Sequence, residues 1–377
     1  MRIFLFRVIL RLFILFFYPA HSYALDEVKI ISGPHVVFDW ATQRCSYDDI
    51  PDSPLRAFRD SSGAVVGLAS HFDVRLFRGD TLIDLQRVCS ISRKSSHASN
   101  PSEYNDKIWV TATWTEDGVN VFALGHHEFQ AHRHPGKCKF ADLGSCWYNS
   151  IVALKSTDSG MNFYKVDHLK PIASANIRSE DMQGRPRGFF SPTNIFSRNG
   201  YLYSIILTTG DPSQPYGHCL FRTLRQGDLL NWEYWDGVTW IPSAHDPYKD
   251  SPKRPCSILK NLYSIGSVIE QGGRYIAVGA MPGGKYKGQI VYNTSRDLIT
   301  WSEPRPLINI KTEMSESKCG EYVYSYPSIL SPSSRSRNFE DTGEELALFL
   351  TRRKYKGCAG TMERDLVYFK IIIKNAN

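Results

Sequence analysis

The sequence predicts an all-β fold, a five-bladed β-propeller. A turn motif, S-x-D-x-G-x-x-F, occupies Ser156–Phe163, and related turns occupy Gly227–Trp232 and Ser295–Trp301. The three turns lie about 70 residues apart, which indicates a repeated structural unit. Strand-forming segments alternate with Gly-containing turns in the same order in each unit. The sequence contains five such units, although the periodicity alone leaves a six-bladed ring and a β-sandwich open.

The turn motif has a physical basis. The side chain of Asp158 can accept hydrogen bonds from nearby backbone N–H groups and so close the turn. Gly160 supplies a backbone conformation that other residues resist. The aromatic side chain of Phe163 is then placed to pack under the blade. We expect Trp232 and Trp301 to pack in the same way.

The repeated units follow one another along the chain. A short β-like segment, residues 28–40, comes before them. We expect it to pair with the last unit and close the ring, because closure removes exposed sheet edges. A long insertion at 129–149 interrupts the second unit. The expected units span residues 52–92, 104–166, 187–236, 262–305 and 321–373.

Residues 1–24 are expected to be a secretory signal peptide and not part of the fold. Arg2, Arg7 and Arg11 precede the apolar run 12–18, and Ser22–Ala24 is a small-x-small cleavage signal. A membrane anchor is the alternative, but the apolar stretch is short for a bilayer span. We therefore expect a single propeller domain at 25–377, secreted or periplasmic, monomeric, and free of the membrane after cleavage.

The chain is moderately basic. Its formal charge is +7, and three of these charges belong to the arginines of the leader. The remaining charge of +4 gives no reason to expect a nucleic-acid partner. It is compatible with an anionic ligand such as an acidic sugar, and equally with a solvated basic surface.

The cysteine count is even, which in an exported chain favours disulfides. No C-x-x-C pair is present, so a zinc site of that kind is not indicated. Sequence does not fix the connectivity. We expect neighbouring cysteines to pair, which would cross-link loops within or between adjacent blades. The expected pairs are Cys45–Cys89, Cys138–Cys146, Cys219–Cys256 and Cys319–Cys358.

These motifs resemble those of known propeller families. The S-x-D-x-G-x-x-F turn is similar to the Asp-box of the six-bladed sialidases. The five-fold count and the S-x-D-L-x-x-W turn look more like the five-bladed glycoside hydrolases of the arabinanase, invertase and levansucrase group. The resemblance is spread over residues 50–373 and implies a carbohydrate ligand at one mouth of the channel. Asp-boxes also occur in non-catalytic propellers, so the motif indicates fold more directly than function.

Glycoside hydrolysis uses two carboxyl groups that flank the scissile bond. Asp52 begins the first unit, where the resemblance places a catalytic base, commonly as Asp-Pro; here Ser53 intervenes. Glu128 lies in the densest polar cluster, residues 126–134, and is a candidate general acid. Glu321 opens the fifth unit. The fourth unit has no carboxylate at the corresponding place, in residues 261–266.

Other residues are candidates for holding the substrate. On a strand, His126 and Glu128 face one side and His127 the other, and either side could face the channel. The run Tyr324-Ser-Tyr326 loosely resembles the phrase that carries the sialidase tyrosine. Guanidinium groups recognise carboxylates well. The six substrate-binding candidates are Arg56, Trp109, His127, Arg187, Tyr324 and Tyr326.

Three functions fit these residues. The leading hypothesis is a secreted glycoside hydrolase that acts on an oligo- or polysaccharide without a cofactor. A polysaccharide lyase that uses His and Tyr beside a uronate is the second, and a non-catalytic carbohydrate-binding or adhesion propeller is the third. The spacing from His127 to His132 does not match the H-E-x-x-H zinc motif. We therefore expect no catalytic metal, while a structural ion in the channel remains an alternative.

Overall fold

β-strands form nearly all of the regular structure, which confirms the predicted all-β class. The computed structural model describes residues 27–167 and 169–374, so the predicted signal peptide lies outside the described residues. Within this part of the chain, no helix has the length and apolar character needed to cross a membrane. The helical segments are α1 (Trp40–Gln43) and the 3-10 turns η1 (Pro101–Glu103), η2 (Ala131–Arg133) and η3 (Gly284–Tyr286).

The first repeated unit folds as a four-stranded antiparallel sheet in sequence order. Asp60 closes the first hairpin by accepting backbone N–H bonds from Ser62 at 2.8 Å and Ala64 at 3.1 Å. The strands are β2 (Arg56–Arg59), β3 (Val65–Leu68), β4 (Val74–Gly79) and β5 (Gln86–Arg93).

The second and third units join in one eleven-stranded sheet. The junction is β10, which pairs with β8 in parallel over two residue pairs and with β12 in antiparallel fashion. The second unit comprises β6 (Lys107–Trp114), β7 (Val121–Gln130), β8 (Trp147–Ser156) and β9 (Tyr164–Lys165). The third comprises β10 (Arg187–Phe190), β11 (Phe196–Arg198), β12 (Tyr201–Thr208), β13 (Gly217–Leu224), β14 (Glu233–Trp235), β15 (Trp240–Pro242) and β16 (Ile258–Leu259).

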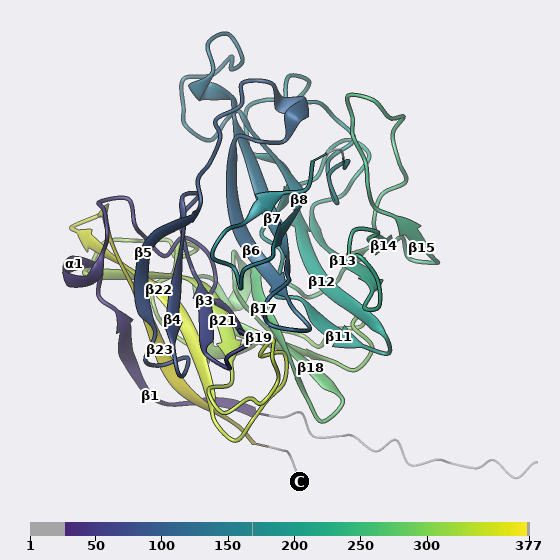
Figure 1. Cartoon of the computed structure of the whole chain (residues 1–377). Coiled ribbons are helices and arrows are strands. Elements are labelled where there is room, and N and C mark those ends of the chain that lie inside the picture. The colour runs from purple at the N-terminus through teal and green to yellow at the C-terminus, as the bar shows by residue number, and fades with distance from the viewer. Residues whose placement is uncertain (1–26, 168, 375–377) are drawn as a thin grey trace, which may run out of the picture.

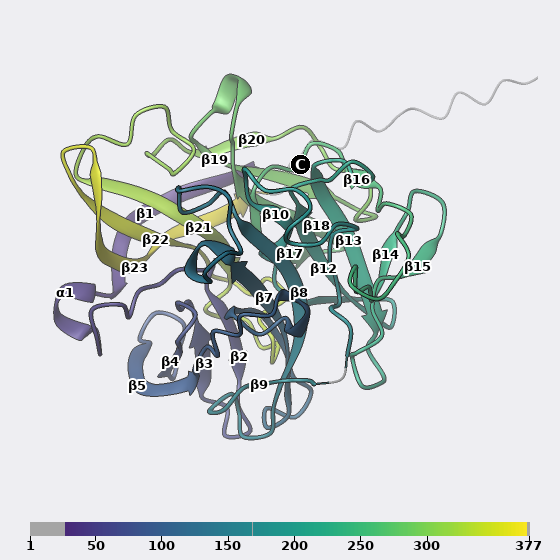
Figure 2. The same cartoon turned by 90° about the horizontal axis from the view of Figure 1, so that it is seen from above.

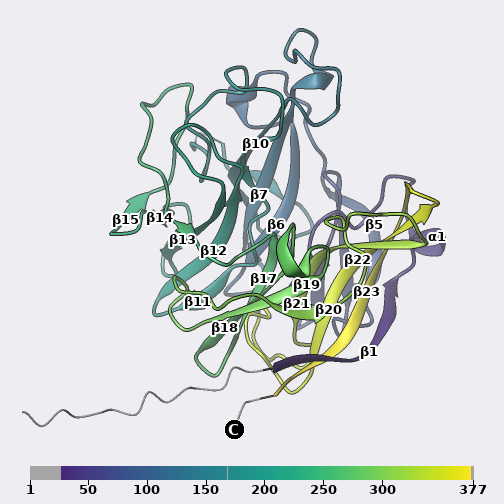
Figure 3. The same cartoon turned by 180° about the vertical axis from the view of Figure 1, so that it is seen from behind.

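The last two sheets each contain four strands. The N-terminal strand β1 is the outer strand of the final sheet, where Glu27 faces Lys374 and Val36 faces Val367 in antiparallel register. The prediction that residues 28–40 pair with the last unit is therefore confirmed, and Figure 3 shows β1 beside β23. The strands are β17 (Ile265–Gln271), β18 (Arg274–Ala280), β19 (Ile290–Ser295) and β20 (Arg305–Ile308), then β21 (Tyr322–Leu330), β22 (Leu346–Lys356), β23 (Ala359–Lys374) and β1 (Glu27–Phe38).

The sheets stand around a common centre, as the view from above in Figure 2 shows. Apolar clusters fill the spaces between neighbouring units, and the last cluster joins the final sheet back to the first. Burial of these side chains is the main force that holds the units together. In chain order the clusters include Phe58 with Val110, Leu124 with Phe221, Ile205 with Val268, Ile276 with Phe369, and Phe77 with Phe349.

The predicted turns close as their chemistry requires. Asp158 accepts the backbone N–H of Asn162 at 2.9 Å, and Gly160 has φ +83°. Asp297 likewise accepts the N–H of Thr300 at 2.7 Å. The aromatic residues that follow are buried, with Phe163, Trp232 and Trp301 each at most 5% exposed.

All four predicted disulfides are present. Each joins neighbours in the cysteine order, as Cys45–Cys89, Cys138–Cys146, Cys219–Cys256 and Cys319–Cys358. Cys146, Cys219 and Cys256 belong to the apolar clusters, so two of these bonds lie at the core. The fourth ties the chain before β21 to the tip of the β22–β23 hairpin.

Candidate active site

A pocket of about 300 Å³ opens where the first strands of several units begin. Pro54 precedes β2, Ser191 follows β10, and Gly266 is on β17. Tyr324 and Tyr326 on β21 form another wall, and Glu313 lies at the same pocket. The volume is at the lower end of the range for small-molecule sites and would hold a single sugar residue. In the orientation of Figure 1, β6 and β7 reach higher than β17 and β21, the strands that carry Gly266 and the two tyrosines.

Asp52 is the centre of a polar network beside this pocket. Its carboxylate accepts the hydroxyl proton of Tyr326 at 3.1 Å and the indole N–H of Trp109 at 3.3 Å. The guanidinium of Arg364, on β23, also donates to it and forms an ion pair. His71 Nε2 lies 3.8 Å away. Four separate segments of the chain thus converge on one carboxylate.

The backbone at Tyr326 explains how its side chain reaches Asp52. The β21–β22 register shifts between Ser325 and Ser328, so a bulge interrupts the ladder. Tyr326 lies in this bulge with φ +57°, a conformation that non-glycine residues rarely adopt. Bulges commonly redirect a side chain at a binding site. Burial raises the pKa of Tyr326, and the charge of Asp52 raises it further, so the phenol keeps its proton.

Glu128 is a second buried carboxyl group, near enough to Asp52 for the two charges to interact. It is only 5% exposed, and its Oε1 accepts a bond from Gln130 Nε2 at 2.6 Å. Burial raises the pKa of Glu128 to about 8. The Gln130 bond opposes this rise, and the negative charge of Asp52 adds to it. At neutral pH Glu128 therefore holds a proton that it can donate.

Trp109, which donates to Asp52, also stacks on His126, on the strand that carries Glu128. Their rings stack with centroids 5.7 Å apart, and the ring of His71 meets Trp109 edge-on. His126 Nε2 contacts Asn149 Oδ1 at 2.9 Å. Burial lowers the pKa of His126 to about 4, so the imidazole is neutral at pH 7. Because Asn149 donates its amide to the carbonyl of Arg187, its oxygen is free to face the imidazole N–H.

The predicted alternation along β7 is confirmed, and it places His127 away from the network. His127 is fully buried on the opposite face of the strand, where its ring meets Tyr104. Its Nδ1 contacts Ser150 Oγ at 2.9 Å. Burial lowers the pKa of His127 to about 3, as expected for a core histidine.

Arg56 is enclosed beneath the pocket. Its side chain donates to the carbonyls of Thr111 at 2.7 Å, Pro192 at 3.0 Å and Gly266 at 2.7 Å. These acceptors belong to three other repeated units, so Arg56 joins the first unit to them at the ring centre. The guanidinium is occupied by these bonds and does not itself reach into the pocket.

The other three candidates lie on β10 and at or just before β21. Arg187 begins β10 and connects to His126 only through Asn149. Tyr324 lines the pocket, and burial raises its pKa. Glu321 is exposed at the start of β21, where its carbonyl accepts the backbone N–H of Tyr355. Among the described residues, Glu321 contacts neither Asp52 nor Glu128.

Sequence reasoning did not identify Arg364, His71 or His126 as site residues. Arg364 is 312 positions from Asp52, and it lies in a strand with many charged residues, so no local pattern marks it. Strand alternation grouped His126 with Glu128, but the choice of candidates took His127 and not His126. Within residues 27–167 and 169–374, no group of three or more His, Cys, Asp or Glu side chains is arranged to hold a metal ion.

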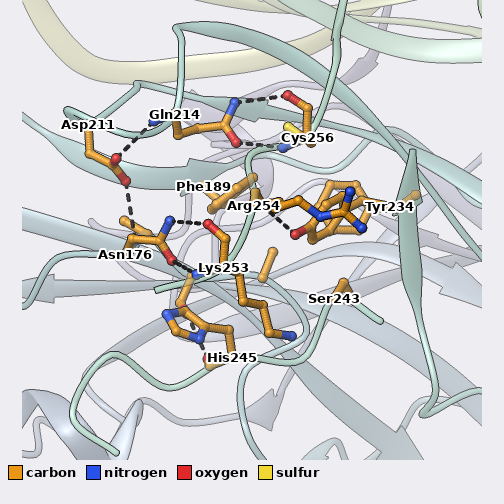
Figure 4. Close-up of a pocket in the computed structure, with 14 residues that line it drawn as sticks. Asn176, Phe189, Asp211, Gln214, Tyr234, Ser243, His245, Lys253, Arg254 and Cys256 are labelled. Carbon is orange, nitrogen blue, oxygen red and sulfur yellow. Dashed lines mark hydrogen bonds between the residues drawn. The ribbon is translucent and has the colours of Figure 1, made fainter. Parts of the chain in front are cut away.

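A second cavity, shown in Figure 4, has a structural role. Its volume of about 30 Å³ suits one water molecule, not a sugar. Asn176 exchanges two 2.9 Å bonds with the backbone of Lys253, and Gln214 bonds the backbone N–H and carbonyl of Cys256. These contacts lock two loops beside the Cys219–Cys256 disulfide. None of the predicted site residues lines this cavity.

The comparisons with known proteins concern the fold. No family model matches the sequence, and no curated protein matches it. The structure is similar to a glycoside hydrolase family 43 β-1,3-galactosidase, with 11% identity, a TM-score of 0.50, and coverage of 91% of this chain and 60% of that chain. It is also similar to a thermostable family 43 glycoside hydrolase, with 12% identity, a TM-score of 0.47, and coverage of 87% and 94%. An α-L-arabinanase mutant from Cellvibrio cellulosa is also similar, with 10% identity, a TM-score of 0.46, and coverage of 85% of this chain and 90% of that chain.

At these identities the likeness shows the fold alone. The similarity to the galactosidase supports a β-propeller, as predicted, although the chain spans about three fifths of that protein's length. The structure thus confirms the propeller fold that the sequence resemblance implied.

Proposed function

We propose that this protein is an exported, five-bladed propeller glycoside hydrolase in which Asp52 and Glu128 are the catalytic carboxyl groups. The five inter-unit apolar clusters support the blade count, with the eleven-stranded sheet taken as two blades joined at β10. The four disulfides support export, because such bonds persist in oxidising compartments.

One observation carries the proposal: two carboxyl groups whose charges interact have environments that suit different roles. Glu128 is buried and protonated at neutral pH, which suits a general acid. Asp52 accepts bonds from Arg364, Tyr326 and Trp109, which hold its side chain in place for a role as base or nucleophile. Glycosidases need this division between an acid and an ionised partner.

The remaining candidates receive supporting roles. Tyr324 and Tyr326 line the pocket and would contact the sugar, and Trp109 offers an aromatic edge beside Asp52. Arg187 would act at the rim. Glu321, His127 and Arg56 would contribute to the structure around the site, because none of them meets the two carboxyl groups in this fold.

The test is a screen of plant, algal and animal glycans, read for both new reducing ends and unsaturated products. Reducing ends that disappear in Glu128→Gln, and persist in a control at the exposed Glu344 (Glu344→Gln), support the proposal. Unsaturated products would support the lyase instead, since His126 and Tyr326 are groups that could move a proton beside a uronate. Binding without either product would support a carbohydrate-binding propeller.

A further inference from the structure

We infer that the pocket takes an anionic sugar residue, bearing a carboxylate or a sulfate, held by the unbalanced charge of Arg56 and by the basic tip of the β22–β23 hairpin. This inference rests on the proposed function in that it takes the pocket to bind carbohydrate. It adds the class of sugar, which neither the fold nor the two catalytic carboxyl groups specifies.

The first step is the charge of Arg56. The side chain is 2% exposed, and its partners are carbonyl groups. Among the described residues, no carboxylate forms an ion pair with it. Burial lowers the pKa of Arg56 to about 9, which still leaves it charged at neutral pH. A buried charge without a counter-ion acts over a longer distance than a solvated one.

The second step is its position under the pocket. Gly266, whose carbonyl accepts from Arg56, lines the pocket. Pro192 and Leu55 also accept from Arg56, and their chain neighbours Ser191 and Pro54 line the pocket as well. One layer of backbone therefore separates the guanidinium from the ligand space.

The third step is the balance of the other charges. Asp52 is paired with Arg364, and Glu313 with Lys318 at 3.0 Å. Glu128 is neutral at pH 7, since burial raises its pKa to about 8. The charges within these ion pairs compensate one another, so the positive charge of Arg56 remains uncompensated at the pocket. A neutral sugar gains nothing from that charge, whereas an anionic one is attracted by it.

The fourth step is the β22–β23 hairpin. Tyr324 lines the pocket and lies opposite Arg352 on β22, so the hairpin adjoins that wall and its tip lies a few residues further out. Arg352 is paired with Asp365 and Lys354 with Glu363. Arg353 instead donates to the carbonyl of Thr361, and Lys356 is exposed, and neither forms an ion pair with an acidic side chain among the described residues. These two cations extend the positive region along a bound chain.

The experiment compares three galactose-based ligands by titration calorimetry: oligogalacturonate, a sulfated galactan oligosaccharide and a neutral β-1,4-galactan oligosaccharide. We expect at least one anionic ligand to bind about tenfold or more tightly than the neutral one. The carboxylate and sulfate arms identify which anion fits. The preference should weaken as NaCl rises from about 50 to about 500 mM. Equal binding of all three, tighter binding of the neutral ligand, or binding of none overturns the inference.

A variant pair tests the hairpin without disturbing the core. Arg353→Gln combined with Lys356→Gln should reduce the preference for the anionic ligand by about threefold or more. Lys370→Gln, an exposed change near the other end of β23, should leave it unchanged. A melting temperature close to that of the wild type shows that the double variant is folded, since Lys356 is exposed and Arg353 is half-buried. An unchanged preference in that folded variant contradicts the inference.

Binding and turnover separate this inference from the proposed function. An anionic ligand that binds tightly and is never cleaved would refute hydrolysis and leave the inference standing. A neutral glycan that is bound and cleaved as well as its anionic counterpart would refute the inference and leave hydrolysis standing.

Discussion

Arg56 and Gly266 are 210 residues apart in the chain, yet a guanidinium N–H of Arg56 donates to the Gly266 carbonyl at 2.7 Å. The same nitrogen also bonds the carbonyl of Pro192 at 3.0 Å. One side chain thus ties the first unit to the third and fourth at the centre of the ring. Buried polar groups that lose such a partner carry the full cost of their desolvation.

Arg56→Met should therefore lower the free energy of unfolding by about 2 kcal/mol or more, because three buried carbonyls would lose their donor. Arg59→Met is the matched control on the same strand. Arg59 is half-buried and makes a 3.0 Å bond to the carbonyl of Ser334, so we expect a smaller loss. Urea unfolding of both variants measures the difference. A loss in Arg56→Met no greater than in Arg59→Met would contradict the role assigned to the ring centre.

Glu128→Gln should abolish turnover, and the wild-type rate should fall as pH rises through about 8, where the acid loses its proton. The direction in which the free energy of unfolding changes with pH also follows from this pKa. The ordinary pKa is 4.5 and the folded pKa is about 8, so the folded state holds a proton that the unfolded state has lost between these values. Stability contributed by this group therefore falls as pH rises through that window.

Thermal melts across this pH range check the second part. Glu128→Gln should melt close to the wild type near pH 5 and above it near pH 9, since the amide carries no charge to bury. A variant that melts below the wild type at both values would show that Glu128 is bound as an anion.

Asp52→Asn should reduce turnover by about a hundredfold or more, because an amide cannot act as base or nucleophile. It also leaves the partly buried Arg364 without its counter-charge. A double-mutant cycle with Arg364→Gln should give a coupling of about 0.5–3 kcal/mol in unfolding free energy. Additive effects of the two changes would mean that the ion pair contributes little in solution.

Gly266→Ala should destabilise the fold by about 3 kcal/mol or more, since a Cβ there would lie 1.9 Å from the carbonyl oxygen of Pro327. The close approach brings β17 against β21 beside the pocket. Gly227→Ala is the control, because a Cβ at that position meets nothing within 4 Å. We expect the control to stay within about 0.5 kcal/mol of the wild type. Similar melting temperatures for the two variants would contradict the packing described here.

Local chemistry made much of the fold predictable. The turn at Asp158 and the alternation of His126, His127 and Glu128 depend on residues close in sequence or on a fixed period of two. The cysteine connectivity is not fixed by the sequence, and the four expected neighbour pairs form in the structure. The pairing of β1 with the last sheet followed from the need to cover an edge. Each of these expectations is confirmed by the structure.

The site itself was only partly predictable, because its contacts cross the ring. Arg364 reaches Asp52 from the other end of the chain, and nothing near either residue specifies that contact. Arg56 was predicted to hold substrate, and the identity of its carbonyl partners depends on how three other units meet. Tyr326 reaches Asp52 through a bulge that no strand pattern indicates. Tertiary geometry, not residue type, assigns these roles.

The pairing of β1 with β23 also has a consequence for biogenesis. Glu27 faces Lys374, so the final blade cannot be completed until β23 has been synthesised. Until then β1 has no partner strand, and its open edge would be available to chaperones or proteases. Removal of either strand should leave the final sheet incomplete.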